Sequence, residues 1–411
     1  MQSYNYVIIG GGLAGQRAGD GIRKVDPEGT VALVTEEQHL PYERPPLSKG
    51  YLTGTKGLGR VYLKEEEYYY QNSIEVMTGV RATNVDPDAC SVMLDDGRML
   101  GYEKLLLATG GRAWRLPIPG SDLPGVFTLR TIEDVDGIRE AVRLGAQALV
   151  LGGSFIGSEV ASSLAQLGLS VTMVFPEARL LELIVPQELS ALLHAKYEAH
   201  GVQILPGTKP ERLEGDGMVE RAVLDTGETL DIDLVVMGVG IRLNTKLAHD
   251  AGLELGERGA VVVDETLRTS DPNIYAAGDI AAWPDPTFGK RLRVEHWDVA
   301  RRQGLRAGRN MAGEEKPYTS LPYFFSDLFD FSFEVWGNLT AWDQTVTRGA
   351  LESGSFALYY FDQGRMVGVL AVGRPDEERE PMQALVRARP EYADVATELR
   401  DEGADLSTLV E

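Results

Sequence analysis

The amino-acid sequence predicts a multidomain α/β fold, and three features carry this prediction. Two glycine-rich loops stand about 140 residues apart, and each follows an apolar strand and precedes a helix. From Tyr318 onward, aromatic-rich strands at 322–337 and 355–372 give way to a helical tail. Apolar strands that alternate with helices are typical of parallel sheets covered by helices. We therefore expect two Rossmann-like dinucleotide-binding domains, followed by a smaller α+β domain.

The composition is that of an ordinary soluble protein, with 43% hydrophobic and 25% charged residues in a chain of 411. This length exceeds what one hydrophobic core supports, so two or three domains are expected. The net charge of -22 disfavours binding to nucleic acid or to an anionic membrane. No apolar run approaches the ~20 residues that a bilayer requires, and no signal-peptide pattern precedes the first strand.

The chain has a single cysteine, Cys90. The fold therefore does not depend on internal disulfides, and a cytoplasmic location is expected. The same count excludes the cysteine pair that flavoenzymes need to reduce disulfides. Five histidines and one thiol also disfavour a structural metal site. We interpret Cys90 as a small buried apolar residue in a strand.

The first unit has a βαβ pattern, with a strand at 4–10, a helix at about 14–24 and a strand at 30–34. Gly10 permits a tight turn, Gly12 lets the backbone approach a pyrophosphate, and Gly15 allows close packing of helix on strand. Glu36 lies 21 residues after Gly15, where an acid accepts hydrogen bonds from a ribose. The alternative is a glycine turn in a domain that binds no nucleotide.

The segments after this unit predict a stiff loop and a small sheet. Three prolines within 39–49 predict an extended course. Residues 74–108 alternate apolar and polar positions, as in a β-meander, and lead into a tight turn at 108–111. Prolines 117 and 119 mark a linker.

The second unit, about 114–245, repeats the plan with a strand at 148–152, a helix at 157–168, a strand at 171–175 and an apolar run at 235–240. Its loop departs from the pattern, because Ser154 replaces the middle glycine between Gly152 and Gly157. The Cβ of Ser154 would crowd a pyrophosphate, unless the hydroxyl donates a hydrogen bond to it. The alternative is a degenerate loop that binds no nucleotide.

The end of the strand at 171–175 bears on the choice of nicotinamide nucleotide. The position of the expected acid holds Phe175, and Glu177 follows two residues later. A carboxylate there repels a 2′-phosphate, so NADH is favoured over NADPH. Arg179 weakens this preference.

Four short segments together form a specific pattern: residues 41–49 (PYERPPLSK), 108–110 (ATG), 275–279 (YAAGD) and 294–297 (VEHW). With this pattern the chain resembles the FAD-dependent ferredoxin reductases of oxygenase systems, to which monodehydroascorbate reductases and apoptosis-inducing-factor flavoproteins are closely related. The resemblance runs nearly end to end. It implies a glutathione-reductase-like architecture in which the NAD domain is inserted into the FAD domain. We expect an FAD domain at 1–113 and 246–316, an NAD domain at 114–245 and a C-terminal interface domain at 317–411.

The resemblance implies catalytic positions for Lys49, Glu159 and His296. Lys49 would lie near the flavin N5 and pair with Glu159, because a lone charge beside a buried isoalloxazine is costly to desolvate. The helix that begins near His296 would place its positive end by the flavin N1, where reduction builds negative charge. The alternatives are two solvated surface charges and a packed histidine.

The same resemblance, together with the two loops, supplies the remaining contacts to FAD and NADH. Asp279 would accept hydrogen bonds from the ribityl chain, although a Gly-Asp pair after a strand can be a simple turn. Phe155 would lie beside the nicotinamide as a gate, or belong to the core. The other cofactor-binding positions are Leu13, Ala14, Arg44, Ala108, Thr109, Gly110, Ile156, Gly240, Gly278, Glu295, Trp297 and Phe325.

The sequence indicates the electron acceptor less clearly than it indicates the cofactors. The pair Ser326-Asp327 is similar to ferredoxin reductases, whereas the opening at 321–324 (LPYF) is similar to monodehydroascorbate reductases. Arg301 matches the arginine that holds ascorbate in the latter group. The position of Phe325 is usually tyrosine in that group and tryptophan in the ferredoxin reductases.

We therefore predict an NADH-dependent flavoprotein reductase that passes single electrons to a small ferredoxin- or rubredoxin-type protein. One alternative is reduction of a small organic radical, monodehydroascorbate, held by Arg301. Another is a slow NADH-sensing flavoprotein like apoptosis-inducing factor. A monomer or a homodimer is compatible with the sequence.

Overall fold

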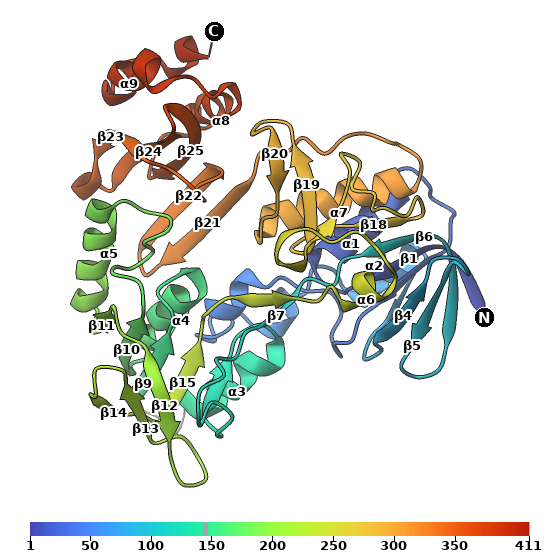
Figure 1. Cartoon of the computed structure of the whole chain (residues 1–411), viewed down its shortest axis with the longest axis horizontal. Helices are drawn as coiled ribbons and strands as arrows, with labels where there is room; N and C mark the ends of the chain where they lie inside the picture. Colours follow the sequence, from blue (N-terminus) through green and yellow to red (C-terminus); the bar gives the residue numbers. More distant parts are fainter. Residues whose placement is uncertain (143–146, 411) are drawn as a thin grey trace. The chain divides into compact units, whose positions relative to one another are not determined.

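The structure is a computed structural model that describes residues 1–142 and 147–410. The chain forms two compact units (Figure 1). The first unit contains Met1–Glu43, Leu58–Arg112 and Arg242–Pro322. The second contains Arg44–Gly57, Ala113–Ile241 and Tyr323–Glu411. The NAD-type segment and the C-terminal segment thus share a unit with residues 44–57, and the division into 1–113, 114–245, 246–316 and 317–411 stays a prediction.

The first unit is built on a seven-stranded sheet. Its path runs β3-β2-β1-β6-β5-β4, and β18 adds to β6. The strands are β1 (Gln2–Ile9), β2 (Val31–Val34), β3 (Ile74–Met77), β4 (Ala82–Asp86), β5 (Ser91–Leu94), β6 (Met99–Leu107) and β18 (Ile274–Ala276). β1 pairs in parallel with β2 and β6, and β18 pairs in parallel with β6, so segments far apart in the chain complete one sheet.

The predicted meander at 74–108 is only partly correct. β4, β5 and the beginning of β6 are antiparallel. β3 instead pairs in parallel with β2, and β6 pairs in parallel with β1 from Leu100 to Leu107. The apolar run at the end of β6 is buried between β1 and β18, and both of these strands pair with it in parallel.

Helices α1 (Leu13–Arg23) and α7 (Trp297–Met311) pack closely in the first unit. A Cβ at Gly304 would lie 2.2 Å from the carbonyl oxygen of Ala14, and one at Gly308 would lie 2.0 Å from that of Ala18. These two contacts advance in the same direction along both helices. α1 and α7 are therefore parallel, and both begin at the end of the sheet where β1 ends.

Shorter elements complete the first unit. They are the 3₁₀ helices η2 (Leu58–Arg60) and η3 (Glu257–Gly259), α2 (Glu66–Gln71), α6 (Lys246–Asp250), β17 (Val261–Val262), β19 (Ala281–Asp285) and β20 (Lys290–Leu292). β7 (Gly111–Ala113) and β16 (Ile241–Leu243) lie where the chain passes from one unit to the other.

The second unit contains a parallel sheet in the order β11-β10-β9-β15-β8. Its strands are β8 (Val126–Thr128), β9 (Gln147–Leu151), β10 (Ser170–Phe175), β11 (Gln203–Pro206) and β15 (Leu234–Met237). The helices are α3 (Ile132–Val142), α4 (Phe155–Gln166) and α5 (Gln187–Ala199). A three-stranded antiparallel sheet adds β12 (Pro210–Glu214), β13 (Arg221–Leu224) and β14 (Thr229–Asp231).

The C-terminal part is α+β, as predicted. Five antiparallel strands follow the order β21-β22-β25-β24-β23. They are β21 (Tyr323–Leu328), β22 (Phe331–Gly337), β23 (Gln344–Ala350), β24 (Ser355–Asp362) and β25 (Arg365–Val372), with η4 (Leu351–Ser353) between β23 and β24. The tail forms η5 (Asp376–Glu378), α8 (Arg379–Ala388), α9 (Tyr392–Arg400) and η6 (Leu406–Leu409). Edge strand β23 was not predicted, because its polar and glycine residues lack the aromatic pattern of its neighbours.

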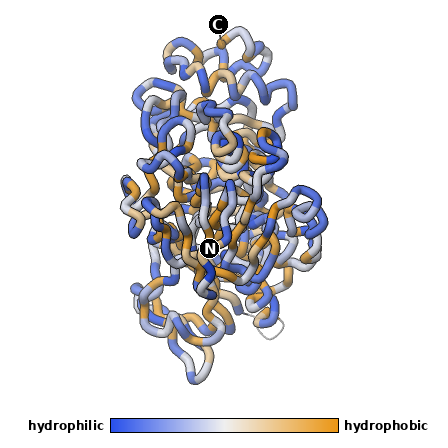
Figure 2. Tube along the Cα trace, turned by 90° about the vertical axis from the view of Figure 1, so that its right-hand side faces the viewer, coloured by the Kyte–Doolittle hydropathy of each residue, from blue (hydrophilic) through white to orange (hydrophobic). Residues whose placement is uncertain are grey.

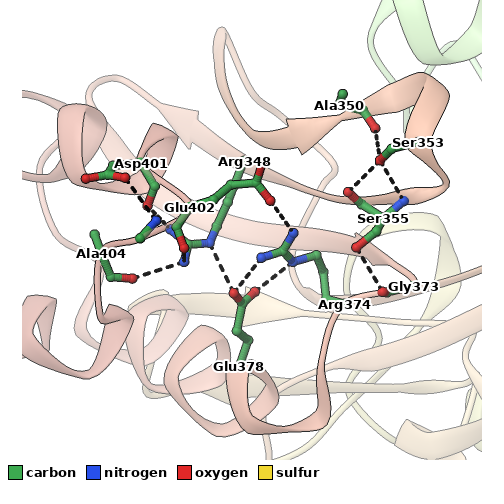
Figure 3. A network of polar contacts seen from close by, with 11 residues as sticks. Arg348, Ala350, Ser353, Ser355, Gly373, Arg374, Glu378, Asp401, Glu402 and Ala404 are labelled. Carbon is green, nitrogen blue, oxygen red and sulfur yellow. Dashed lines mark hydrogen bonds and ion pairs between the residues drawn. The ribbon is translucent and has the colours of Figure 1, made fainter.

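A buried ion-pair network ties edge strand β23 to the tail (Figure 3). The Arg348 side chain is 3% exposed and pairs with Glu378 at 3.2 Å. Arg374, 7% exposed, binds the same carboxylate at 2.5 Å. Arg348 also donates to the main-chain oxygens of Asp401, Glu402 and Ala404. A single guanidinium thus holds the turn after α9 against the sheet.

Two local predictions were wrong. Residues Pro45–Ser48 form the 3₁₀ helix η1 rather than an extended segment, because Pro45 and Pro46 occupy its first positions, where no helical N–H is needed. Cys90 is half-buried in the turn between β4 and β5, with φ of 45°, and is not in a strand.

Hydrophobic residues are interspersed with hydrophilic ones along the trace in Figure 2. Across residues 1–142 and 147–410, no helix has the length and apolar character needed to cross a membrane. The largest fully buried side chains include Trp283 and Tyr275 in the first unit and Tyr197 and Phe175 in the second.

Candidate active site

The first glycine-rich loop has the geometry of a dinucleotide cradle. Gly10 has φ of +120°, and a Cβ there would lie 2.2 Å from the oxygen of Ala108. A Cβ at Gly15 would lie 2.0 Å from the oxygen of Gly10. In contrast, a Cβ at Gly12 would meet no atom within 4 Å. Gly10 and Gly15 are therefore required by the fold, whereas Gly12 leaves open the space that a pyrophosphate would take.

Neighbouring turns surround this loop. Gly278 has φ of +80°, and its N–H donates a hydrogen bond to the side-chain Oε1 of the buried Gln303 at 2.9 Å. A Cβ at Gly278 would lie 3.2 Å from that of Ala14. On the other side, Thr109 Oγ1 donates to the main-chain oxygen of Asn244 at 2.6 Å, and Gly110 accepts from the N–H of Asn244. The predicted residues 108–110 and 278 are thus brought to the same loop.

Glu36 is exposed just beyond the end of β2, as a ribose-binding acid requires. The next residue, Glu37, accepts a hydrogen bond from the hydroxyl of Tyr42. Leu13, the first residue of α1, is half-buried, and Ala14 is buried against Gly278.

The beginning of α7 has the placement that the sequence predicts. His296 is the N-cap residue and Trp297 is the first helical residue, and no side-chain hydrogen bond caps this helix. Burial lowers the pKa of His296 to about 4, although the charge of Asp279 opposes this shift. His296 is therefore neutral at pH 7. Glu295 is exposed and pairs with Arg293 at 2.5 Å.

Arg301 is engaged by its own helix. Its Nε and Nη2 donate to Asp298 Oδ1 at 2.9 and 2.7 Å, and its guanidinium lies 5.5 Å from the ring centre of Trp297. Asp298, which is 2% exposed, also accepts from Arg302. The Arg301 side chain remains 31% exposed, and its role as a ligand of an organic radical stays a prediction.

The second glycine-rich loop repeats the geometry of the first. Gly152 has φ of +118°, and a Cβ there would lie 2.4 Å from the oxygen of Gly238. A Cβ at Gly157 would lie 2.0 Å from the oxygen of Gly152. Ser154 is exposed and is the N-cap residue of α4, but its side chain makes no capping hydrogen bond. Its hydroxyl is therefore not used to cap the helix. Ile156, two residues later, is 40% exposed.

Phe175 and Glu177 have different roles from each other at the end of β10. Phe175 is 1% exposed, and its ring lies 2.7 Å from where a Cβ of Gly153 would stand, so it supports the loop from below. Glu177 is half-buried and is the acid that can face a ribose. Arg179 pairs with Glu182 at 3.4 Å, which reduces the attraction it offers to a 2′-phosphate.

The pair Lys49–Glu159 is formed in the second unit. Lys49 Nζ lies 2.7 Å from Glu159 Oε1, and the two side chains are 21% and 7% exposed. Ser48 Oγ donates to Glu159 Oε2 at 2.5 Å, and Ser326 Oγ donates to Oε1 at 2.7 Å. The interpretation as two solvated surface charges is therefore wrong. The acid is buried, and the amine reaches it from partly exposed space.

Aromatic side chains adjoin this pair. Phe155 packs edge-on against Phe324, with ring centres 5.0 Å apart. Phe325 is 37% exposed, and Lys49 Nζ lies 5.8 Å from its ring centre.

The predicted FAD-binding residue Arg44 donates to the main-chain oxygen of Arg130.

Gly240 is exposed, has φ of +98° and accepts a hydrogen bond from the N–H of Trp114 at 2.9 Å. Its conformation is one that side chains rarely adopt, which explains a glycine there.

Sequence reasoning missed five residues that shape the site. A repeated glycine pattern pointed to Gly153, and the apolar run at 235–240 contained Gly238, but neither was assigned a role. The other three residues are Ser48, Gln303 and Ser326. Their side chains bind residues more than 20 positions away in the chain, so no local pattern reveals them. The five residues are Ser48, Gly153, Gly238, Gln303 and Ser326.

Comparison with known proteins identifies the family. The sequence profile described as "Pyridine nucleotide-disulphide oxidoreductase" matches residues 4–304, and the one described as "Reductase C-terminal" matches residues 323–410. The chain belongs to the pyridine nucleotide-disulphide oxidoreductase family. It is therefore a nicotinamide-nucleotide-linked flavoprotein reductase with FAD as its flavin, and the resemblance stated from the sequence is confirmed.

Individual relatives are similar over nearly the whole chain. The benzene 1,2-dioxygenase system ferredoxin--NAD(+) reductase subunit of Pseudomonas putida is 35% identical over 398 residues, covering 96% of each chain. The rubredoxin-NAD(+) reductase of Pseudomonas putida is 34% identical and covers 90% of this chain and 96% of its own. The structure of a covalent putidaredoxin reductase–putidaredoxin complex has a TM-score of 0.92 at 31% identity, covering 100% of this chain and 99% of that chain.

The family name includes disulphide chemistry, which this chain cannot perform with its own side chains. One cysteine cannot supply a redox-active pair, and Cys90 lies in a turn of the first unit far along the chain from both loops.

Proposed function

We propose that this chain accepts hydride from NADH on FAD and passes electrons one at a time to a ferredoxin- or rubredoxin-type protein. The observation that carries the proposal is the likeness, over nearly the full length, to reductases named for such partners. Bound FAD supplies the step from two-electron to one-electron chemistry.

The proposal assigns roles to the residues of the site. The loop around Gly12, with Glu36 and residues 108–110, would hold FAD. Asp279 and the N-terminus of α7, with neutral His296, would lie on the flavin side. A neutral histidine at a helix N-terminus adds no second positive charge to the one from the helix dipole.

Lys49 and Glu159 would order the place where hydride transfer occurs. The ammonium group would present positive charge toward the flavin, and the carboxylate would fix its direction. This role is consistent with the 2.7 Å separation and with the burial of Glu159. Lys49 stays partly exposed, so a cofactor can reach it.

NADH is the proposed donor. The N-terminus of α4 and the Ser154 hydroxyl would bind its pyrophosphate. Glu177 would accept hydrogen bonds from the ribose hydroxyls and disfavour NADPH. The pairing of Arg179 with Glu182 supports this preference.

One experiment separates the proposed activity from reduction of the monodehydroascorbate radical. NADH oxidation is measured with enzymatically generated monodehydroascorbate radical, and separately with a [2Fe–2S] ferredoxin or a rubredoxin coupled to cytochrome c. Efficient turnover with the radical, near ~10⁶ M⁻¹s⁻¹ or above, would replace the proposal by radical reduction and give Arg301 a substrate. Cytochrome c reduction that depends on the iron–sulfur protein or the rubredoxin supports the proposal.

Anaerobic reduction of the flavin tests the third activity. A sensor would hold a long-lived reduced flavin–NAD⁺ charge-transfer complex and change its oligomeric state. A reductase would lose that complex quickly on adding the acceptor and keep its mass in solution. We further propose that the chain acts in the cytoplasm as a monomer or homodimer.

A further inference from the structure

We propose that Ser326 is a positioning residue for the Lys49–Glu159 pair, so that a strand of the C-terminal domain orders the site of hydride transfer. Ser326 is 0% exposed, and its hydroxyl donates to Glu159 Oε1 at 2.7 Å. The same oxygen accepts from Lys49 Nζ at 2.7 Å. The inference rests on the proposed function, in which Lys49 faces the flavin.

The three donors to Glu159 come from two separate parts of the chain. Ser48 and Lys49 belong to the segment at η1, and Ser326 lies 167 residues after Glu159. The main-chain oxygen of Ser48 accepts from Ser163 Oγ on α4 at 2.6 Å, so the η1 segment is tied to α4 independently. Ser326 is the donor that the C-terminal domain contributes.

The direction of the Ser326 side chain follows from strand geometry. Successive side chains of a strand point to opposite faces. Phe324 and Ser326 face α4, where they contact Phe155 and Glu159. Tyr323, Phe325 and Asp327 instead line a cavity of about 450 Å³ on the other face. Figure 1 shows β21 beside α4.

A second contact fixes the register of β21 on α4. The main-chain N–H of Phe329 donates to Ser162 Oγ at 2.9 Å. Ser162 lies three residues after Glu159 on the same helix, so both contacts use one face of α4. A shift of β21 along α4 would therefore break both the Ser326–Glu159 and the Phe329–Ser162 hydrogen bonds.

The physical role of Ser326 is to limit the orientations of a buried carboxylate. With Ser326 present, each oxygen of Glu159 accepts from a hydroxyl, and Lys49 has one position at Oε1. Without the hydroxyl, Oε1 retains only the amine, and the carboxylate can rotate about Ser48. Lys49 would then lose its fixed direction, although the ion pair would persist.

The test compares Ser326→Ala with Ser332→Ala in the FAD-loaded enzyme. Ser332 is a matched control, because its hydroxyl donates to the carboxylate of Asp327 at 2.7 Å in the same domain and on the exposed side. Stopped-flow absorbance follows anaerobic flavin reduction by NADH. We expect Ser326→Ala to slow the limiting reduction rate about tenfold with little change in the NADH concentration at half-maximal rate, because a hydrogen bond to a charged group is lost. Ser332→Ala should be unchanged.

A double-mutant cycle separates positioning from general damage. If Ser326 acts through Glu159, Ser326→Ala should have no further effect in a Glu159→Gln background. Ser326→Thr, which keeps the hydroxyl, should reduce the flavin faster than Ser326→Ala. A tenfold loss that adds fully to that of Glu159→Gln would overturn the proposal.

A readout without NADH keeps the inference distinct from the proposed function. The rate at which an amine-reactive reagent labels Lys49 is measured by mass spectrometry in the apoprotein and the FAD-loaded enzyme. We expect faster labelling in Ser326→Ala than in the wild-type chain or in Ser332→Ala. Equal labelling in all three, with equal thermal unfolding, would overturn the positioning role. Failure of the wild-type flavin to accept hydride would instead overturn the proposed function and leave the labelling result meaningful.

Discussion

Gly12 and Gly15 lie in the same loop, but replacement by alanine should affect a different property of the protein at each position. A Cβ at Gly15 would lie 2.0 Å from the oxygen of Gly10, whereas one at Gly12 would meet no protein atom within 4 Å. Gly15→Ala should therefore damage the fold itself. Gly12→Ala should leave the apoprotein intact and weaken only the binding of FAD.

The size of each effect follows from these contacts. Overpacking a core costs about 1–3 kcal/mol, and a clash with backbone oxygen cannot be relieved by a rotamer change. We expect Gly15→Ala to lose at least ~3 kcal/mol of stability or to be insoluble. At Gly12 the helix loses a favoured N-cap residue, which costs about 1 kcal/mol or less. The added methyl meets the pyrophosphate, and about 1–3 kcal/mol of lost affinity corresponds to roughly 5- to 150-fold weaker FAD binding.

The assay uses apoprotein of each variant. Thermal unfolding is followed by far-ultraviolet circular dichroism, and FAD binding by quenching of flavin fluorescence. If Gly12→Ala binds FAD as tightly as the unchanged chain, the pyrophosphate does not approach Gly12 and the assignment of this loop is refuted. If Gly15→Ala unfolds at the wild-type temperature, the packing described for the loop is incorrect.

Three further predictions concern other parts of the molecule. Lys49→Ala should slow anaerobic flavin reduction by NADH in stopped-flow measurements, since Glu159 then lacks its cation, and an unchanged rate would contradict the role of the pair. Arg348→Met should destabilise the C-terminal domain by about 3–5 kcal/mol in denaturant titrations, whereas Arg379→Met, at an exposed ion pair, should cost under ~1 kcal/mol; equal losses would contradict the importance of burial. The folded pKa of His296, about 4, lies below its ordinary value of 6.5, so the unfolded chain binds the proton first and stability should fall as pH drops from 6.5 toward 4. His296→Asn should reduce that fall in Tm, and an identical pH dependence would show that His296 is not the group responsible.

Much of the fold was predictable from local patterns. The two strand–loop–helix units were placed within a few residues, because glycine conformation and apolar periodicity act over short stretches. The boundaries of the meander were not, since parallel and antiparallel pairing depends on which distant strands are neighbours. β3 has the same local pattern as a meander strand, and only its position beside β2 distinguishes it.

The candidate site divides in the same way. Glycines that a backbone contact requires were found from the sequence, and the Lys49–Glu159 pair was found through resemblance. Ser48 and Ser326 were not assigned, because serine is common on surfaces and its hydroxyl has no sequence pattern that indicates its partner. Arg301 was assigned as a substrate ligand through resemblance, and this role stays a prediction; its ion pair with Asp298, three residues earlier, was not foreseen.

Strand β21 has a consequence for how such a reductase can diversify. Its even positions hold Phe324 and Ser326 against α4, and its odd positions line the cavity on the opposite face. Substitution at Tyr323 can therefore reshape the outer surface while the inner contacts keep their places, whereas Phe325 also lies beside Lys49. Alternate residues of a single strand thus allow one face of β21 to vary while the other face keeps its hydrogen bond to Glu159.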